Sequence, residues 1–131
     1  MRLLLDTHAL LWWLNDDQKL GSHVRRLIVD HENDVLVSAV SLWEITVKLR
    51  IGKLDADIDE IFDILPVQGF SRLEITDTHL TTLRNLPLHH RDPFDHLLIA
   101  QALAEGAHFV SQDQHVPLYG LPFLSCSDPA M

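Results

Sequence analysis

Short apolar runs alternate along this chain with longer segments of helical periodicity. Three runs are typical of strands buried on both faces of a sheet: 3–5, 35–38 and 109–110. Two weaker strand signals lie at 73–75 and at 121–124, where Pro122 restricts the second to an edge of the sheet. Helices are expected over 7–14, 22–29, 41–49, 57–65, 78–86 and 93–105. This alternation predicts an α/β sandwich with helices on both sides of a central, mostly parallel sheet.

Glycine and proline residues set several of the expected helix ends. Pro66 is expected to end the fourth helix at residue 65, and Pro87 to close the fifth. Pro93 suits the first turn of the last helix, and Gly106 is its stop signal. The chain shows no repeat, low-complexity tract or linker, so we expect one domain over residues 1–131.

Composition and charge narrow the class of protein. Hydrophobic residues make up 47% of the chain, which indicates a globular fold, and the single cysteine, Cys126, excludes an internal disulfide. The apolar N-terminus does not fit a signal peptide, because Asp6 and His8 interrupt it. No apolar run reaches the roughly 18 residues that a membrane-spanning helix needs. We therefore expect a soluble cytoplasmic protein. The net charge of −9 argues against passive binding to nucleic acid and favours a basic protein partner, but it does not exclude an enzyme that meets phosphate through a metal ion.

Five acidic residues from distant parts of the chain are expected at one edge of the sheet. Asp6 and Asp113 follow the strands 3–5 and 109–110. Glu44 and Asp95 are expected in the first turns of two helices, with Asp92 just before the second. In a parallel layout, helix N-termini and strand carboxyl ends lie at the same edge, which is where such sheets bind ligands.

Each acid also has a purely structural explanation. Glu44 fits a capping box that begins at Ser41. Asp92 suits the N-cap position of the helix that follows, and the negative charge of Asp95 in the first turn is stabilised by the helix dipole. Asp6 and Asp113 suit turns. Together, however, so many like charges at one edge are unfavourable unless a cation neutralises them, and carboxylates with water are ligands that suit Mg²⁺ or Mn²⁺.

Five segments occur in an order that resembles a known family: 5–12 (LDTHALLW), 38–45 (SAVSLWEI), 90–95 (HRDPFD), 98–102 (LIAQA) and 111–113 (SQD). Together they resemble a PIN-domain ribonuclease, specifically the VapC toxins of type II toxin–antitoxin pairs. The separate motifs are weak, but the ordered set is specific and covers nearly the whole chain. Ser111 departs from the threonine that is frequent in the family, while retaining a hydroxyl group.

The resemblance implies a three-layer PIN fold and Mg²⁺- or Mn²⁺-dependent cleavage of RNA. It also implies a cognate VapB-type antitoxin and a homodimer. The family's acidic positions carry over to Asp6, Glu44, Asp95 and Asp113 as catalytic and metal-binding residues, with Asp92 as an additional metal-binding acid. Asp6 and Asp95 are expected to bind the metal most directly, and whether one or two ions bind remains open.

Other classes of protein fit less well. A phosphatase of the haloacid dehalogenase type needs Asp-x-Asp after the first strand, where this chain has Asp6-Thr7-His8, and a receiver domain needs a lysine near Asp113. A zinc site at His89 and His90 lacks a zinc-binding motif. The remaining alternative is a non-catalytic module whose acidic edge binds a basic partner.

Candidate RNA contacts are weaker predictions. Five basic residues are candidates for phosphate contacts, although each is more readily explained as solvated surface charge: Lys48, Arg50, Lys53, Arg84 and Arg91. Trp12, Trp13 and Trp43 are candidates for base stacking, but packing in the core is the favoured interpretation, as it is for His8.

Overall fold

The computed structural model describes residues 1–128 of the chain. One sheet holds five strands: β1 (Arg2–Leu5), β2 (Asp34–Ser38), β3 (Ser71–Leu73), β4 (His108–Ser111) and β5 (Phe123–Ser125). Their order is β3-β2-β1-β4-β5, and every neighbouring pair is parallel. The expected parallel sheet is therefore confirmed, and β5 lies at an edge as Pro122 predicted.

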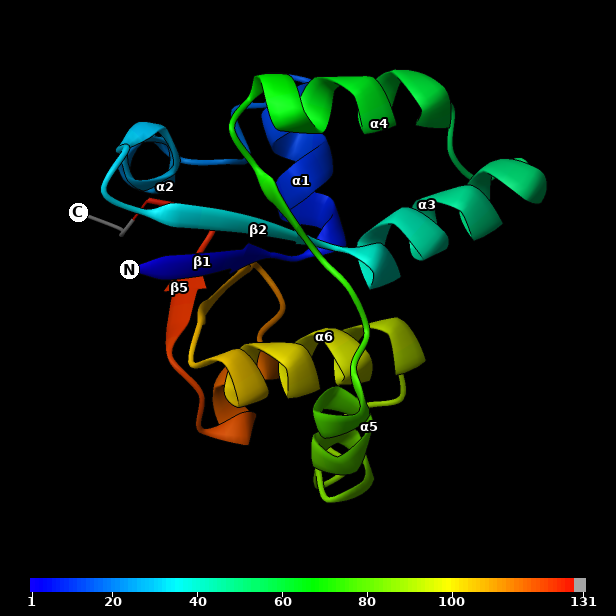
Figure 1. Cartoon of the computed structure of the whole chain (residues 1–131), viewed down its shortest axis with the longest axis vertical. Helices are drawn as coiled ribbons and strands as arrows, with labels where there is room; N and C mark the ends of the chain where they lie inside the picture. Colours follow the sequence, from blue (N-terminus) through cyan, green and yellow to red (C-terminus); the bar gives the residue numbers. More distant parts are fainter. Residues whose placement is uncertain (129–131) are drawn as a thin grey trace.

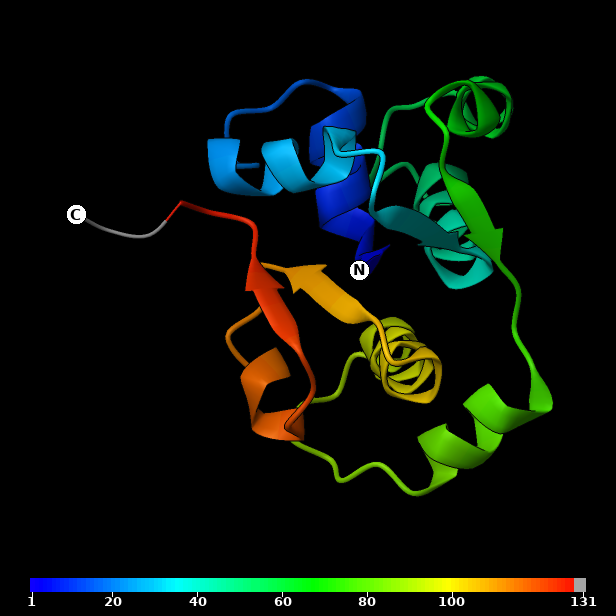
Figure 2. The same ribbon diagram turned by 60° about the vertical axis from the view of Figure 1, so that its left-hand side comes forward.

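Helices cover both faces of this sheet, so that the fold has three layers (Figures 1 and 2). The α-helices are α1 (Thr7–Leu14), α2 (Ser22–Val29), α3 (Ala39–Arg50), α4 (Ile58–Val67), α5 (Asp77–Arg84) and α6 (Pro93–Glu105). A short 3-10 helix, η1 (Val116–Tyr119), precedes β5. In Figure 1, α1, α2 and α4 lie above the sheet, and α5 and α6 lie below it.

Alternation along β1 divides the hydrophobic core between the two faces of the sheet. Leu3 and Leu5 pack in a core with residues of α1, α2 and α4, whereas Leu4 packs with residues of α6 on the other face. All three leucines are fully buried. An uninterrupted apolar run is what a strand needs when helices cover both of its faces, which explains why this signal was readable in the sequence.

The predicted start of α3 is wrong. This helix begins at Ala39, directly after β2, and the Ser38 hydroxyl caps it by accepting a hydrogen bond from the Val40 N–H at 3.0 Å. Ser41 therefore lies inside the helix, and Glu44 lies in the second turn instead of the first. The capping-box explanation of Glu44 fails because the preceding strand already supplies the cap.

Smaller differences concern helix and strand ends. Pro66 does not end α4, which continues to Val67. The fixed φ of proline is itself helical, and Pro66 lies in the last turn, where it disturbs little of the helix. The β3 strand lies at Ser71–Leu73, two residues before the predicted 73–75, since its position is set by pairing with residues 36–38 of β2. Similarly, α5 begins and ends earlier than predicted, and β5 lies slightly later. The predicted bounds of α1, α2 and α6 are confirmed.

A buried polar cluster joins β2, α5 and α6; its members are Ser38, His79, Gln101 and Glu105. The Ser38 hydroxyl donates to the Gln101 side-chain oxygen. His79 Nδ1 accepts a hydrogen bond from the Thr76 backbone N–H at 3.0 Å, and His79 Nε2 lies 2.9 Å from Glu105 Oε2. Ser38, His79 and Gln101 are fully buried, and each has hydrogen-bond partners within the protein. These contacts hold α5 and α6 against the end of β2.

Candidate metal centre

The carboxyl ends of β1 and β4 carry two of the predicted acids. Asp6 follows β1 directly, and its backbone N–H donates to the Val110 carbonyl oxygen of the neighbouring strand at 3.0 Å. Its carboxylate caps α1 by accepting from the Ala9 N–H at 2.7 Å. Asp113 lies two residues beyond β4, where its backbone N–H donates to the Ser111 hydroxyl at 3.1 Å. Because β1 and β4 are adjacent, the two acids reach the same side of the sheet.

The N-terminus of α6 brings two further acids to this edge. Asp92 is the N-cap, and its Oδ1 accepts from the backbone N–H groups of Phe94 and Asp95 at 2.9 and 3.2 Å. Asp95 lies in the first turn, as predicted. Within residues 1–128, the other Asp92 oxygen and the Asp95 carboxylate accept no hydrogen bond, so a capping role for Asp92 is compatible with a role in a site.

The four aspartates line one cavity of about 340 Å³ together with His8, Trp12 and Gln112. Asp6, Asp92, Asp95 and Asp113 come from three separate parts of the sequence. The structure thus brings together four of the five acids that the sequence analysis selected. Glu44 is the exception, since it is not among the residues that line the cavity.

Glu44 lies buried behind the cavity, with both carboxylate oxygens engaged. The Thr7 hydroxyl donates to Oε1 at 2.7 Å, and Lys48, one turn further along α3, lies 2.7 Å from Oε2. Even so, its charge contributes to raising the pKa values of both Asp6 and Asp95. Lys48 is therefore an ion-pair partner of Glu44 and not a free phosphate-binding residue.

Crowding of these acids changes their proton affinities. Burial, followed by repulsion from Asp92, Asp6, Glu44 and Asp113, raises the pKa of Asp95 to about 8. Burial also raises the pKa of Asp6, although hydrogen bonds from the Ser111 hydroxyl and the Ala9 N–H oppose the shift. Without a cation, Asp95 is therefore largely protonated at neutral pH. A positive ion among the acids would reverse this shift.

Asp113 differs from its neighbours. Burial works to raise its pKa, but hydrogen bonds from the His115 backbone and ring outweigh burial, and the pKa lies below its usual value. His115 approaches Oδ1 at 2.8 Å through both its backbone N–H and its Nδ1. The site therefore combines one aspartate that favours the charged form with two that disfavour it in the absence of a cation.

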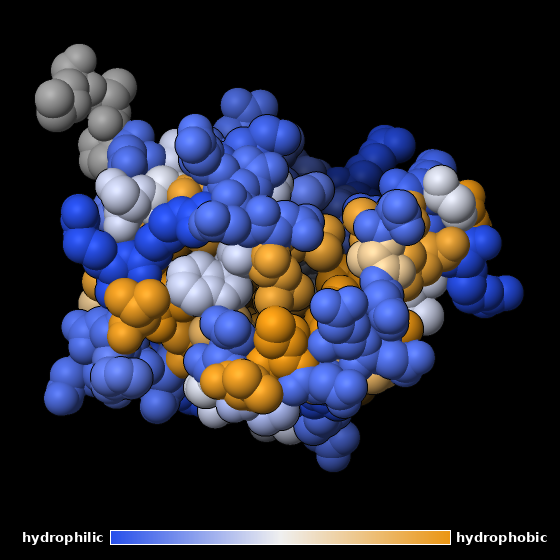
Figure 3. All heavy atoms as spheres, turned by 90° about the horizontal axis from the view of Figure 1, so that it is seen from above, coloured by the Kyte–Doolittle hydropathy of each residue, from blue (hydrophilic) through white to orange (hydrophobic). Residues whose placement is uncertain are grey.

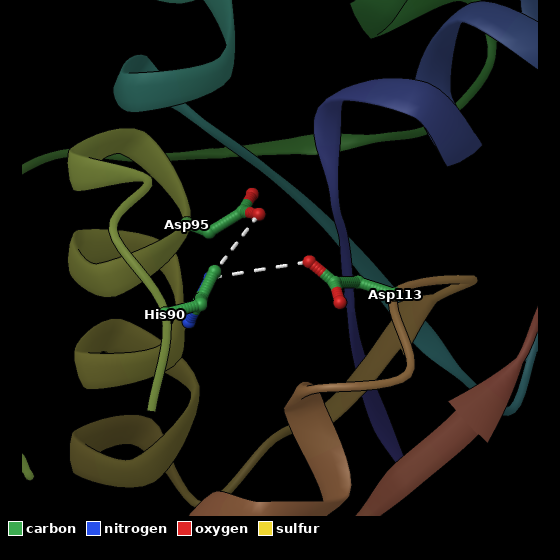
Figure 4. A group of neighbouring side chains, drawn as sticks. All are labelled: His90, Asp95 and Asp113. Carbon is green, nitrogen blue, oxygen red and sulfur yellow. Dashed lines mark ion pairs between the residues drawn. The ribbon is translucent and has the colours of Figure 1, made fainter. Parts of the chain in front are cut away.

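His90 is a further part of this site that was not predicted from the sequence. Its Nε2 lies 3.5 Å from Asp95 Oδ2 and 3.9 Å from Asp113 Oδ2, and Figure 4 shows the ring pointing between the two carboxylates. His90, Asp95 and Asp113 form a group whose ligand atoms all lie within 4.8 Å of one another. The available signal was the position of His90 two residues before Asp92, but it was weighed only as part of a zinc motif.

Two predicted packing roles near the cavity are wrong. His8 is exposed and lies at the cavity, with its ring centroid 5.8 Å from that of Trp12. Trp43 is 56% exposed and contacts Phe94 edge-on, with 4.8 Å between the ring centroids. Trp13, in contrast, packs against Phe70. Helical spacing alone did not separate these positions, because the helix faces near the site are not covered by other elements.

An apolar hollow of about 230 Å³ lies between α1 and α4, and apolar side chains gather in the middle of this face (Figure 3). Its apolar lining includes Leu11, Leu14, Ile61 and Ile64. Three acids also line it: Asp55, Asp57 and Glu60. Among the helices of residues 1–128, none is long and apolar enough to cross a membrane.

Several solved structures share this fold. The structure is similar to VapBC2 from Rickettsia felis bound to a DNA fragment from its promoter, with a TM-score of 0.75, 16% identity, and coverage of 95% of this chain and 98% of that chain. DNA-bound VapBC from Salmonella typhimurium gives a TM-score of 0.72 at 12% identity, and the match covers 96% of this chain and 98% of that chain. For FitAcB from Neisseria gonorrhoeae the TM-score is 0.66 at 15% identity, and the match covers 95% of this chain and 97% of that chain. No curated protein sequence matches the chain.

The family assignment rests on the sequence as well as the fold. Residues 3–120, most of the chain, match the family described as PIN domain. PIN domains are nucleases that typically use divalent metal ions. With its parallel sheet and an acidic cavity at the carboxyl edge of that sheet, this chain belongs to the PIN-domain family.

Proposed function

We propose that this protein is a metal-dependent endoribonuclease, the VapC-type toxin of a type II toxin–antitoxin pair. The observation that carries the proposal is the convergence of four aspartates in one cavity of a PIN-domain chain. The raised pKa of Asp95, about 8, supports it, because this carboxylate needs a nearby cation in order to be charged at neutral pH.

The donor set fits a divalent ion such as Mg²⁺ or Mn²⁺. Asp6 and Asp95 would hold the ion most directly, with Asp92 and Asp113 completing the shell or orienting water. Glu44 belongs to the proposed set as well, because it is buried beside these acids, and a cation would compete with Lys48 for its Oε2. When bound, the ion supplies Lewis acidity toward water and phosphate.

The protein's own residues prepare this site for a phosphodiester. The N–H groups at the start of α6 hold Asp92 in place, and the Ala9 N–H holds Asp6, so that the carboxylates are positioned before substrate arrives. Asp6 is buried and Asp95 is half-buried, and the lower polarity of their surroundings strengthens electrostatic interactions there. The acidic cavity needs a cation before it can accept a polyanion, and this explains how a chain of net charge −9 can act on RNA.

We expect single-stranded or loop RNA as the substrate, because its unstacked bases are accessible. Trp43 and Trp12 lie near the site with exposed or half-buried rings suited to stacking on bases. Arg91 is exposed beside His90 and is the basic residue best placed for a phosphate contact. Such an activity would be exerted in the cytoplasm, where RNA is present.

A cognate VapB-type antitoxin is the proposed protein partner. Its proposed binding surface is the hollow between α1 and α4, where half-buried apolar side chains such as Leu11 and Ile64 stand beside three exposed acids, Asp55, Asp57 and Glu60. This combination suits an amphipathic helix with an apolar face and basic flanks. Relatives of similar fold are described as VapBC and FitAcB assemblies. A homodimer of the toxin remains part of the proposal, to be tested by light scattering during size-exclusion chromatography.

Cleavage of total RNA by antitoxin-free protein tests the enzymatic proposal. Reactions contain Mg²⁺, Mn²⁺ or EDTA, and compare the wild type with Asp6→Asn and Asp95→Asn. Asp63→Asn is a matched control, because Asp63 is an exposed acid on α4. We expect metal-dependent cuts that disappear in the two site variants and persist in the control. A folded protein without activity under any metal would favour the alternative, a non-catalytic module whose acidic edge binds a basic partner.

A second experiment tests the antitoxin surface. Ile64→Asp places a charge in the hollow without touching the acidic cavity. We expect this variant to retain RNA cleavage but to bind the antitoxin at least about 10-fold more weakly, as apolar anchors in interfaces commonly contribute more than 1 kcal/mol. Unchanged antitoxin affinity would place the interface elsewhere on the protein.

A further inference from the structure

His90 has a contact pattern that the four aspartates do not explain. Its side chain is only 9% exposed, and Nδ1 lies 2.8 Å from the Tyr119 hydroxyl oxygen. Its Nε2 is buried and has no hydrogen-bond partner within residues 1–128. A buried polar atom normally has a partner, because it loses its hydrogen bonds to water on burial and leaving it unpaired destabilises the fold. The unpaired nitrogen points toward Asp95 and Asp113 (Figure 4).

The distances from this nitrogen are too long for hydrogen bonds to the carboxylates. Nε2 lies 3.5 Å from Asp95 Oδ2 and 3.9 Å from Asp113 Oδ2, beyond the usual 2.7–3.2 Å range. Two atoms bound at about 2.1 Å to one ion lie between about 3.0 Å apart at a right angle and about 4.2 Å apart on opposite sides. Both separations lie in this interval, so they suit ligands of a shared ion.

Neighbouring groups hold the imidazole in the orientation that a ligand needs. The Tyr119 hydroxyl oxygen also accepts a hydrogen bond from the His89 backbone N–H at 3.1 Å, which fixes it beside His90. A proton on His90 Nδ1 can be donated to this oxygen, and that tautomer leaves the Nε2 lone pair free. The His115 ring stacks on His90 with 5.3 Å between centroids and an interplanar angle of 4°.

We propose that His90 Nε2 is a direct ligand of the cation held by Asp95 and Asp113, so that the site is a mixed nitrogen–oxygen centre that prefers Mn²⁺ over Mg²⁺. The preference follows from ligand chemistry, because imidazole nitrogen binds transition-metal ions well whereas Mg²⁺ favours an all-oxygen shell. This inference rests on the proposed metal site, and it replaces the all-oxygen shell expected from the sequence with one that includes nitrogen.

The competing explanation is that His90 is a cation that only neutralises the acids. In that case a bound metal would displace the ring or leave it outside the coordination shell. The two explanations differ in whether a bound Mn²⁺ ion has an imidazole nitrogen among its ligands. Pulsed electron paramagnetic resonance answers this directly, because a nitrogen bound to Mn²⁺ gives a nuclear coupling that water and carboxylate oxygens do not give.

The experiment loads the full-length protein with Mn²⁺ in the absence of RNA. We expect a nitrogen coupling in the wild type that is lost in His90→Gln and in His90→Asn, which provides a second variant if one fails to fold. Competition with Mg²⁺ gives the ratio of affinities, and we expect the preference for Mn²⁺ to fall at least about 10-fold in both variants. His31→Gln is the matched control, because it removes an exposed histidine ring that does not line the acidic cavity.

The outcomes separate this inference from the proposed metal site. If Mn²⁺ binds and the binding depends on Asp95, but no nitrogen coupling appears, the metal site stands and the role of His90 is overturned. A coupling that persists in folded His90→Gln would also overturn it and would point to another histidine, such as His115. If the wild type binds no Mn²⁺, both proposals fail together.

Discussion

Two buried polar regions of this protein share the helix α6, and they differ in whether their hydrogen bonds are complete. The buried polar cluster contains His79 and Gln101, and each has partners within the protein. The candidate metal centre at the N-terminal end of α6 contains Asp95 and His90. There the carboxylates repel one another, and His90 Nε2 has no hydrogen-bond partner among the residues that the structure describes. A buried region whose polar groups all have hydrogen-bond partners stabilises the fold. A region with unpaired polar groups and repelling charges is suited to bind a ligand that supplies the missing contacts.

Loss of the acids should give the largest effect. Asp95→Asn and Asp6→Asn keep the shape of the cavity, but each removes one of its metal-binding carboxylates. We therefore expect RNA cleavage to fall by more than about 100-fold, given that loss of even outer-shell partners of a metal commonly costs 10–100-fold. Rates of cleavage at saturating Mn²⁺ and Mg²⁺ measure this effect. Gln101→Leu, in the buried polar cluster, should leave the rate per folded molecule within a few-fold of wild type. If Gln101→Leu lost as much RNA cleavage per folded molecule as the aspartate variants, the two regions would not have separate roles in activity and stability.

Disruption of the buried polar cluster should reduce stability instead. Gln101→Leu removes the partner of the Ser38 hydroxyl and a contact of His79, all of them fully buried, so we expect a loss of about 2–3 kcal/mol in the free energy of unfolding. Urea denaturation measures this change. A loss below about 0.5 kcal/mol would show that these hydrogen bonds are replaced by water or by rearrangement.

In the metal-free site, replacing an acid by its neutral amide should raise the stability of the protein, whereas the substitution in the buried polar cluster lowers it. The pKa of Asp95 is raised to about 8, so the folded protein keeps a proton that the unfolded chain loses near pH 4. Metal-free wild type therefore loses stability as the pH rises from about 4 to about 8. At pH 8 we expect Asp95→Asn to be more stable than the wild type by about 1–3 kcal/mol, with the difference shrinking toward pH 4.

Thermal unfolding in EDTA across this pH range provides the measurement. Addition of Mn²⁺ should stabilise the wild type and remove the advantage of Asp95→Asn, because the ion binds only the folded protein. An Asp95→Asn variant that is less stable than metal-free wild type at pH 8 would mean that the Asp95 carboxylate already has a stabilising partner.

The smallest expected effect concerns Glu105 at the rim of the buried polar cluster. A hydrogen bond from His79, and then contacts with Arg2, lower the pKa of Glu105, so its contribution to stability is present at neutral pH and lost as the pH falls through the acidic range. We expect Glu105→Gln to cost at most about 1 kcal/mol at pH 7, since this group is partly solvated, and to reduce the loss of stability on acidification. Comparison of urea midpoints at pH 7 and pH 3 checks both expectations, because the contribution of Glu105 is lost only below the ordinary glutamate pKa.

Most of the fold could be predicted from the sequence, because the patterns that mark its strands and helices lie within short stretches of the chain. Residues 3–5 form a continuous apolar run that only a strand covered on both faces would need, and α6 carries both its start signal, Pro93, and its stop, Gly106. The position of β3 was not readable. Its residues are mostly exposed, and pairing with β2 selects them instead of an apolar pattern.

The candidate site was readable in part for the same reason. Asp6, Asp95 and Asp113 stand at strand ends or in a helix first turn, and the parallel topology alone brings such positions to one edge. Glu44 was assigned to the wrong helical turn, because Ser38 and Ser41 are equally plausible caps in the sequence and only the strand that ends at Ser38 distinguishes them. His8 and Trp43 lie on helix faces whose exposure depends on which other elements cover them.

The sequence by itself determined the order of strands and helices, the parallel sheet and the edge at which the aspartates gather, because apolar periodicity and chain direction are local properties. Only the tertiary structure decided that Lys48 pairs with Glu44 and that His79 has hydrogen-bond partners on both ring nitrogens. It also decided that His90 faces Asp95 and Asp113 with a nitrogen that is unpaired within residues 1–128. The physical reason is that a side chain's partners come from segments distant in sequence, and packing alone sets which of them meet.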